Sequence, residues 1–260
     1  MQSVKGRAIF SWTVEEQLKE EFFADTPNGF FVDVGANEPI NGSQTWHLEQ
    51  KGWRGVLIEP QPQLAQRLKE QRRALVFACA CSSPQNAGKI VRFPLFTLGD
   101  RALDGKGVRT GSLDTSFFVP GMHREEIIEA PARTLDDVLV EANAPVPIDL
   151  VSIDVEGHEV EVLSGLTLTR WRPRLILIED RAFSLRLHRV LRSVGYKWVR
   201  RTGLNGWYVP NGSPMPVSLF GRWQFFRKHY INTPFRNVQD AKRRLRESSW
   251  IGKAAKQGAR

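Results

Sequence analysis

One short segment, residues 31–39 (FVDVGANEP), constrains the fold of this chain more than any other. Its first residues are apolar and predict a buried strand, and Gly35 and Ala36 then keep the following turn small. Residues 41–43 (Asn-Gly-Ser) are typical of a helix start, and a helical pattern follows from Trp46. A strand, a small turn and a helix start in this order predict an α/β sheet with a ligand pocket at the turn, where backbone N–H groups can approach the ligand closely.

Acidic residues at two predicted strand ends indicate the kind of ligand. Asp33 stands just before the turn, and Glu59 ends a second predicted strand, residues 55–59, where an acid can accept both hydroxyl protons of a ribose. The turn lacks the glycine patterns that hold pyrophosphates and nucleoside triphosphates. A ligand with a ribose and a cationic amino-acid end but no pyrophosphate fits, and S-adenosylmethionine has these parts. The alternative is a plain strand–turn–helix unit with a spare Asp33.

Five sequence blocks follow one another in an order that resembles the FkbM family of S-adenosylmethionine-dependent methyltransferases. The blocks are DVGAN at 33–37, NGSQT at 41–45, GVLIEP at 55–60, TLDD at 134–137 and IDVEG at 153–157. The resemblance covers roughly residues 28–182, and the ordered set is specific although each block alone would be weak. It implies an O-methyltransferase that acts on a hydroxyl of a sugar, a glycan or a polyketide-type small molecule.

The strand ends and the resemblance together assign the cofactor site. We expect Asp33 and Gly35 to hold the amino-acid end of the cofactor, Glu59 to hold the ribose, and residues 80–82 to lie near the adenine. The residues expected to bind the cofactor are Asp33, Gly35, Asn37, Ser43, Glu59, Pro60 and Cys81.

Alternating strand and helix patterns predict a doubly wound, Rossmann-like, mostly parallel sheet of seven strands with an antiparallel edge, the class I methyltransferase fold. Strands are predicted at 29–35, 55–59, 75–81, 149–154 and 174–179, with a closing hairpin at 197–201 and 206–209. Helices are predicted at 12–23, 43–51, 63–72, 135–142, 160–164 and 181–194. Residues 82–132 are rich in glycine and predict a loop region with one short strand near 89–93. We expect a lead-in helix in 1–28, the methyltransferase domain in 29–215 and a tail in 216–260.

A polar triplet follows the fourth predicted strand. Asp154, Glu156 and His158 are the candidate catalytic residues, because a hydroxyl is a poor nucleophile until a base or a metal helps to remove its proton. An imidazole titrates near neutral pH and suits this task. The alternative is that Glu156 and His158 only cap the next helix.

Carboxylates at two strand ends also suggest a metal site. Asp154, Glu179 and Asp180 resemble the divalent-metal site of catechol-type and macrolide-sugar O-methyltransferases, and three converging carboxylates would suit Mg²⁺. Such an ion would lower the pKa of a substrate oxygen. The alternative is that Glu179 and Asp180 pair with nearby arginines. In the glycine-rich region, residues 109–117 are either a lid for the acceptor or a plain surface loop.

The net positive charge of the chain comes from its C-terminal part. The formal net charge is +9, and from Gly221 onward there are eleven Lys or Arg residues but only two acids, Asp240 and Glu247, which accounts for the whole excess. Residues 222–230 mix aromatic and cationic side chains, and residues 240–247 predict a basic helix. This tail is a solvated segment, a peripheral membrane contact or, less favoured, a nucleic-acid contact.

Two other functions stay open from the sequence. An RNA methyltransferase would rest on the basic tail alone, and a non-catalytic scaffold would retain the nucleotide fold without the reaction. We expect Cys79 and Cys81 to be buried like small apolar residues, since two thiols so close on one strand cannot readily form a disulfide or a zinc site. The sequence has neither an apolar run long enough to span a membrane nor a secretory signal, so we expect a cytoplasmic location, with the tail at the inner face of the membrane.

Overall fold

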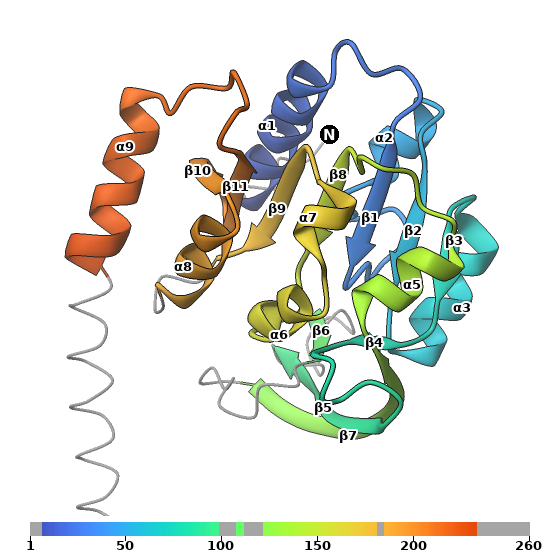
Figure 1. Ribbon diagram of the computed structural model, residues 1–260. Helices are drawn as coiled ribbons and strands as arrows, with labels where there is room; N and C mark the ends of the chain where they lie inside the picture. The colour runs from blue at the N-terminus through green and yellow to red at the C-terminus, as the bar shows by residue number, and fades with distance from the viewer. Residues whose placement is uncertain (1–6, 99–107, 112–121, 181–184, 233–260) are drawn as a thin grey trace, which may run out of the picture.

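The structure is a computed structural model that describes residues 7–98, 108–111, 122–180 and 185–232. In this part of the chain the main sheet has seven strands in the order β10-β11-β9-β8-β1-β2-β3 (Figure 1). They are β1 (Phe30–Val34), β2 (Arg54–Ile58), β3 (Leu75–Phe77), β8 (Leu150–Ile153), β9 (Leu175–Glu179), β10 (Tyr196–Thr202) and β11 (Asn205–Pro210). Strand β11 is antiparallel to both of its neighbours, and the pairings of β3, β2, β1, β8 and β9 are parallel. The predicted mostly parallel sheet with an antiparallel closing pair is therefore confirmed.

The sheet is apolar on both faces because helices cover both of them. Phe30, Val32 and Val34 of β1 face one core cluster, whereas Phe31 faces the other, as the alternation of side chains along a strand requires. Helices α5 to α8 contribute to the first cluster and α1 to α3 to the second. The helices are α1 (Arg7–Phe22), α2 (Trp46–Gln50), α3 (Pro62–Gln71), α5 (Leu135–Glu141), α6 (Glu159–Ser164), α7 (Leu168–Trp171) and α8 (Arg186–Ser193).

Parallel pairing in register brings the ends of the central strands together. Val34 of β1 lies opposite Ile58 of β2 and Ile153 of β8, so the residues that follow all three strands emerge at one edge of the sheet.

The start of the helix predicted at 135–142 is confirmed, because the side chain of the preceding Thr134 accepts a hydrogen bond from the backbone N–H of Asp137. The helix predicted at 43–51 is shorter than expected and begins only at Trp46.

The prediction of a loop-rich region for residues 82–132 was wrong in part: the short strand predicted near 89–93 is present within β5, but much more of the region is strand than expected. Two long strands, β5 (Ile90–Leu98) and β7 (Met122–Arg133), pair antiparallel within a second sheet of order β4-β7-β5-β6, with β4 at Ala80–Cys81 and β6 at Val108–Gly111. Charged residues interrupt the alternation of β7, and this hides the strand in the sequence. The strand predicted at 75–81 is divided between the two sheets, and its Cys79 and Cys81 are buried free thiols, as expected.

A further helix, α9 (Leu219–Phe226), packs on the sheet edge opposite to β3, and the π-helical η1 (Arg227–Asn232) continues it (Figure 1). Gly221 permits the close approach, because a Cβ at this position would lie 2.5 Å from the carbonyl oxygen of Val199 in β10. Among the described residues, none of the helices is long and apolar enough to cross a membrane. The basic helix predicted at 240–247 lies outside the described residues.

The packing of β1 against β2 yields a test of the fold. A Cβ at Gly55 would lie 2.4 Å from ring carbons of Phe31 and 2.5 Å from its carbonyl oxygen, so Gly55→Ala should lower the free energy of unfolding by about 1–3 kcal/mol. A Cβ at Gly212 meets nothing within 4 Å, and Gly212→Ala should change it by less than about 1 kcal/mol. Urea unfolding of both variants measures the difference, and equal stabilities would contradict the register of β1 and β2.

Candidate functional site

A pocket opens where the carboxyl ends of β1, β2 and β8 face the second sheet. Its volume of about 250 Å³ is near the lower end of the roughly 300–1,000 Å³ that ligand pockets occupy. Strand ends, the turn after β1 and the start of the second sheet line it together. The lining includes Asp33, Gly35, Asn37, Gln44, Glu59, Pro60, Cys79, Cys81, Phe93, Asp154, Glu156 and His158. Most residues predicted to act on the cofactor or the reaction are thus brought to one place.

The turn after β1 is fixed tightly to its neighbours. Gly35 has a φ of +83°, and a Cβ on it would lie 1.9 Å from the carbonyl oxygen of Asp154, so no other residue fits without a shift of the backbone. The N–H groups of Gly35 and Ala36 both donate to the carbonyl oxygen of Ile58, at 2.9 and 3.1 Å. These two N–H groups therefore hold the turn to β2 and are not directed at a ligand, contrary to our expectation.

Glu59 is a buried carboxylate held in place by the backbone. One of its oxygens accepts from the N–H of Asn37 at 3.0 Å and the other from the N–H of Gln61 at 2.9 Å. Burial raises the pKa of Glu59 to about 7, although both hydrogen bonds oppose the shift. An ionised carboxylate has about four acceptor positions. Two of these positions are left for a ligand that donates two hydroxyl protons.

Asp33 lies deeper than Glu59, beneath the helices of the α1–α3 face. It is 2% exposed, and one of its carboxylate oxygens accepts from the hydroxyl of Thr45 at 2.8 Å. Burial raises its pKa, and the hydrogen bond from Thr45 and the charges of Arg72 and Lys19 partly offset that effect. Asp33 is therefore one member of a buried polar network rather than an isolated ligand-binding acid.

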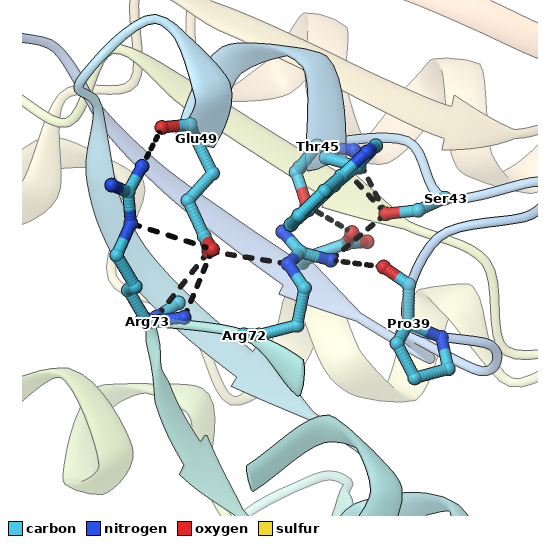
Figure 2. A network of polar contacts seen from close by, with 9 residues as sticks. Pro39, Ser43, Thr45, Glu49, Arg72 and Arg73 are labelled. Carbon is cyan, nitrogen blue, oxygen red and sulfur yellow. Dashed lines mark hydrogen bonds and ion pairs between the residues drawn. The ribbon is translucent and has the colours of Figure 1, made fainter. Parts of the chain in front are cut away.

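Arg72, the residue directly after α3, is the centre of this network (Figure 2). Its guanidinium donates to the hydroxyl of Thr45 at 3.1 Å, to the hydroxyl of Ser43 at 3.0 Å and to the carbonyl oxygen of Pro39 at 2.9 Å. The Nε atom donates to Glu49 at 3.2 Å, and both of these side chains are almost completely buried. One arginine thus ties the loop between β1 and α2 to Asp33.

Ser43 has a different role from the one predicted, and Lys19 has a role that was not predicted. Ser43, expected to bind the cofactor, does not line the pocket, and its hydroxyl accepts from Arg72 and from the N–H of Thr45. Lys19 of α1, 1% exposed, donates to the carbonyl oxygen of Gln44 at 2.6 Å and so fixes a residue that lines the pocket. Burial lowers the pKa of Lys19.

Three carboxylates gather at the ends of β8 and β9. Asp154, Glu156 and Glu179 each offer an oxygen that lies within 4.8 Å of the others. Burial, followed by the nearby charge of Glu179, raises the pKa of Asp154 well above its usual range. Of the residues predicted as metal ligands, Asp154 and Glu179 lie in this cluster, and Glu156, which was predicted only as a catalytic residue, lies there too.

Asp180 does not belong to this cluster. Its carboxylate forms a buried ion pair with Lys228 of η1, and Lys228 also donates to the carbonyl oxygen of Asp180 at 3.3 Å. The prediction of Asp180 as a metal ligand is corrected accordingly, because its carboxylate is already paired with the ammonium group of Lys228. The partner is a lysine from the C-terminal region, not one of the arginines considered from the sequence.

His158 faces the pocket from the start of α6. Its Nε2 atom lies 2.8 Å from the hydroxyl oxygen of Ser82, and its Nδ1 atom lies 3.9 Å from a carboxylate oxygen of Glu161. It occupies the position before the helix, but its side chain makes no capping hydrogen bond. The ring is thus held between the second sheet and α6. The lid predicted at 109–117 is described only as far as Gly111, so its Ser112 and Asp114 lie outside the described residues.

Part of the pocket lining is apolar. Cys79 and Cys81 contribute to it together with Phe93 of the second sheet. A hydrogen bond with Cys79 and burial raise the pKa of Cys81 well above its usual range, so its thiol is neutral at physiological pH. This apolar part of the lining suits a flat ring such as adenine, which we expected near residues 80–82.

Comparisons with known proteins identify the family of the chain. The family model for the methyltransferase FkbM domain matches residues 33–197, more than half of the chain. A solved structure of a methyltransferase FkbM from Methylobacillus flagellatus KT is similar at 19% sequence identity and a TM-score of 0.43. The match covers 70% of this chain but only 44% of that one. No curated protein matches the chain.

Two neighbouring arginines test the buried network. Arg72→Met removes a buried cation beside Glu49 and should lower the free energy of unfolding by about 3–5 kcal/mol. Arg73 approaches the same acid at 4.0 Å, but its side chain is 70% exposed, so Arg73→Met should cost only about 0–1 kcal/mol. Urea unfolding of the two variants gives both values. A similar small loss for both would show that the network around Arg72 contributes little.

Proposed function

The chain belongs to the FkbM family of methyltransferases, and on this premise we propose that its pocket binds S-adenosylmethionine and that the methyl group goes to a hydroxyl of a sugar, a glycan or a polyketide-type small molecule. One observation carries the proposal of the cofactor. Glu59 is held by two backbone N–H groups at the end of β2 and lines the pocket with acceptor positions to spare. This is the arrangement that a ribose requires.

The rest of the pocket fits the other parts of this cofactor. The acids Asp33 and Asp154 both line the pocket together with Gly35 and would attract the cationic amino-acid end and the positive sulfur. The apolar part of the lining at Cys79, Cys81 and Phe93 would receive the adenine ring. When bound, S-adenosylmethionine supplies a methyl group on a cationic sulfur atom, which leaves as a neutral thioether.

The residues around the methyl position would act mainly by placing the acceptor and by accepting a proton. Alignment of the hydroxyl oxygen with the methyl carbon is the largest contribution expected from the protein. As the new C–O bond forms, the hydroxyl proton must go to a base. Asp154 is suited to this role because its raised pKa makes the carboxylate a stronger proton acceptor than an exposed aspartate. His158 and Glu156 would then orient the acceptor from the same side of the pocket.

Binding of a metal ion is a second role that we propose for the cluster of three carboxylates. Oxygens of Asp154, Glu156 and Glu179 lie within 4.8 Å of one another, and carboxylate oxygens are the ligands that Mg²⁺ prefers. These residues would hold the ion, and the ion would lower the pKa of an acceptor hydroxyl.

The two alternative functions are less well supported. An RNA methyltransferase would bring phosphates to a pocket lined by Glu38, Asp154 and Glu156, and these acids would repel them. A non-catalytic scaffold would have no use for Glu59 and Asp154, whose burial is costly unless a ligand or a proton compensates their charge.

Calorimetric titration tests the cofactor site through Glu59. Because its pKa is about 7, only about a tenth of the wild-type protein carries the ionised form at pH 6, and the Kd for S-adenosylhomocysteine should be about tenfold weaker there than at pH 8. Glu59→Gln should bind weakly at both pH values and lose this dependence, whereas the exposed Glu70→Gln should behave as wild type. Equal binding by wild type and Glu59→Gln at pH 8 would remove Glu59 from the site.

Manganese serves as a probe of the acid cluster, because the free ion has a strong electron paramagnetic resonance signal at room temperature. Wild-type protein should quench this signal, and Mg²⁺ should compete. Glu156→Gln should weaken Mn²⁺ binding by at least about tenfold, a loss that even outer partners of a metal produce. Exposed Glu129→Gln is the control. Mn²⁺ that stays free with the wild-type protein would leave Asp154 as a base that works without a metal.

A further inference from the structure

The helix pair α9–η1 is firmly attached to the domain through one of its faces. Gln224 and Arg201 of β10 exchange two hydrogen bonds between side chain and backbone, of 3.1 and 3.2 Å. Lys228 is 4% exposed and forms the ion pair with Asp180. The ring of Phe225 lies 5.3 Å from that of Trp198. The orientation of α9 on the sheet is therefore fixed by packing and by a buried charge pair.

The opposite face of α9–η1 is apolar and open. Leu219, Trp223, Phe226 and Tyr230 recur at the spacing of one helix face, and their exposed fractions are 84%, 50%, 47% and 68%. The rings of Trp223 and Phe226 are stacked with centroids 6.0 Å apart, and those of Phe226 and Tyr230 with centroids 5.3 Å apart. We call these four residues the aromatic face. A cluster of this kind on a surface usually marks an interaction site.

The surroundings of the aromatic face are basic. Between Asp180 and Asp240 the sequence contains no acidic residue. Exposed Arg222 and Arg227 come from α9–η1 itself, and a groove between α8, β10 and α9 is lined by Arg192, Lys197 and Arg222. A partner must therefore tolerate apolar rings and supply negative charge at the same place.

We propose that the aromatic face docks on the surface of an anionic phospholipid membrane. Trp and Tyr are amphipathic rings that favour the boundary between headgroups and acyl chains, and the arginines beside them would contact lipid phosphates. A second copy of the chain is a poorer partner, because it would bring a like-charged surface to the same place. The inference concerns a surface away from the pocket and does not depend on the proposed reaction.

Vesicle co-sedimentation of the full chain tests the proposal. The protein should bind vesicles of phosphatidylcholine mixed with phosphatidylglycerol and should bind far less to phosphatidylcholine alone. Each cation at an anionic surface strengthens binding roughly fivefold, so Arg222→Glu/Arg227→Glu should weaken it at least about 25-fold at low salt. Raising the salt concentration should weaken wild-type binding too, because exposed charges are then screened.

Apolar variants separate docking from general attraction by the basic tail. Trp223→Ser/Phe226→Ser should lower the vesicle partition coefficient at least about tenfold. Leu75→Ser/Ile90→Ser, which alters two apolar side chains that are similarly exposed elsewhere, should leave it unchanged. Quenching by brominated lipids should fall in Trp223→Phe, a variant that keeps the apolar area and removes only the indole.

Several results would overturn the proposal. It fails if the wild type ignores anionic vesicles, or if Trp223→Ser/Phe226→Ser binds them as well as the wild type does. A dimer that dissociates in this variant, or an RNA oligonucleotide that binds through these two rings in place of vesicles, would assign the aromatic face to another partner. Binding of S-adenosylhomocysteine by the same variants shows that they are folded, and its presence or absence in the wild type reports separately on the proposed cofactor site.

Discussion

The burial of acidic side chains at the carboxyl edge of the parallel sheet is the constraint on which the rest of the structure depends. Register places the ends of β1, β2 and β8 side by side, so Asp33, Glu59 and Asp154 must share a small volume shielded from water. Their pKa values all rise for this reason. The free-energy cost of burying these acids is partly offset, because the backbone and two buried cations, Arg72 and Lys19, hold some of them in place.

Those two cations hold the loop that lines the pocket in place. Arg72 reaches Asp33 through Thr45. It also fixes the loop that precedes α2 at three points, Pro39, Ser43 and Thr45 (Figure 2). Lys19 fixes the same loop from α1 through Gln44. A loop held in this way loses little further freedom when a ligand binds, which favours affinity.

The sequence predicted the acids well and their partners poorly. Asp33, Glu59 and Asp154 could be found because each lies at or next to the end of a mainly apolar strand, and parallel strands end at one edge. Arg72 could not be found, since an arginine at a helix end is ordinarily a solvated residue, and only the tertiary fold places it beside Glu49. Asp180 was misassigned for the same reason, because its partner Lys228 is distant in sequence. The second sheet was missed because charges on β7 obscure its period.

The ion pair between Lys228 and Asp180 has a mechanical consequence. Asp180 directly follows Glu179, one of the three clustered carboxylates, and the pair with Lys228 joins this strand end to the helix that carries the aromatic face. Displacement of η1 would leave the buried carboxylate of Asp180 without its counter-ion, so the pair holds η1 to the end of β9.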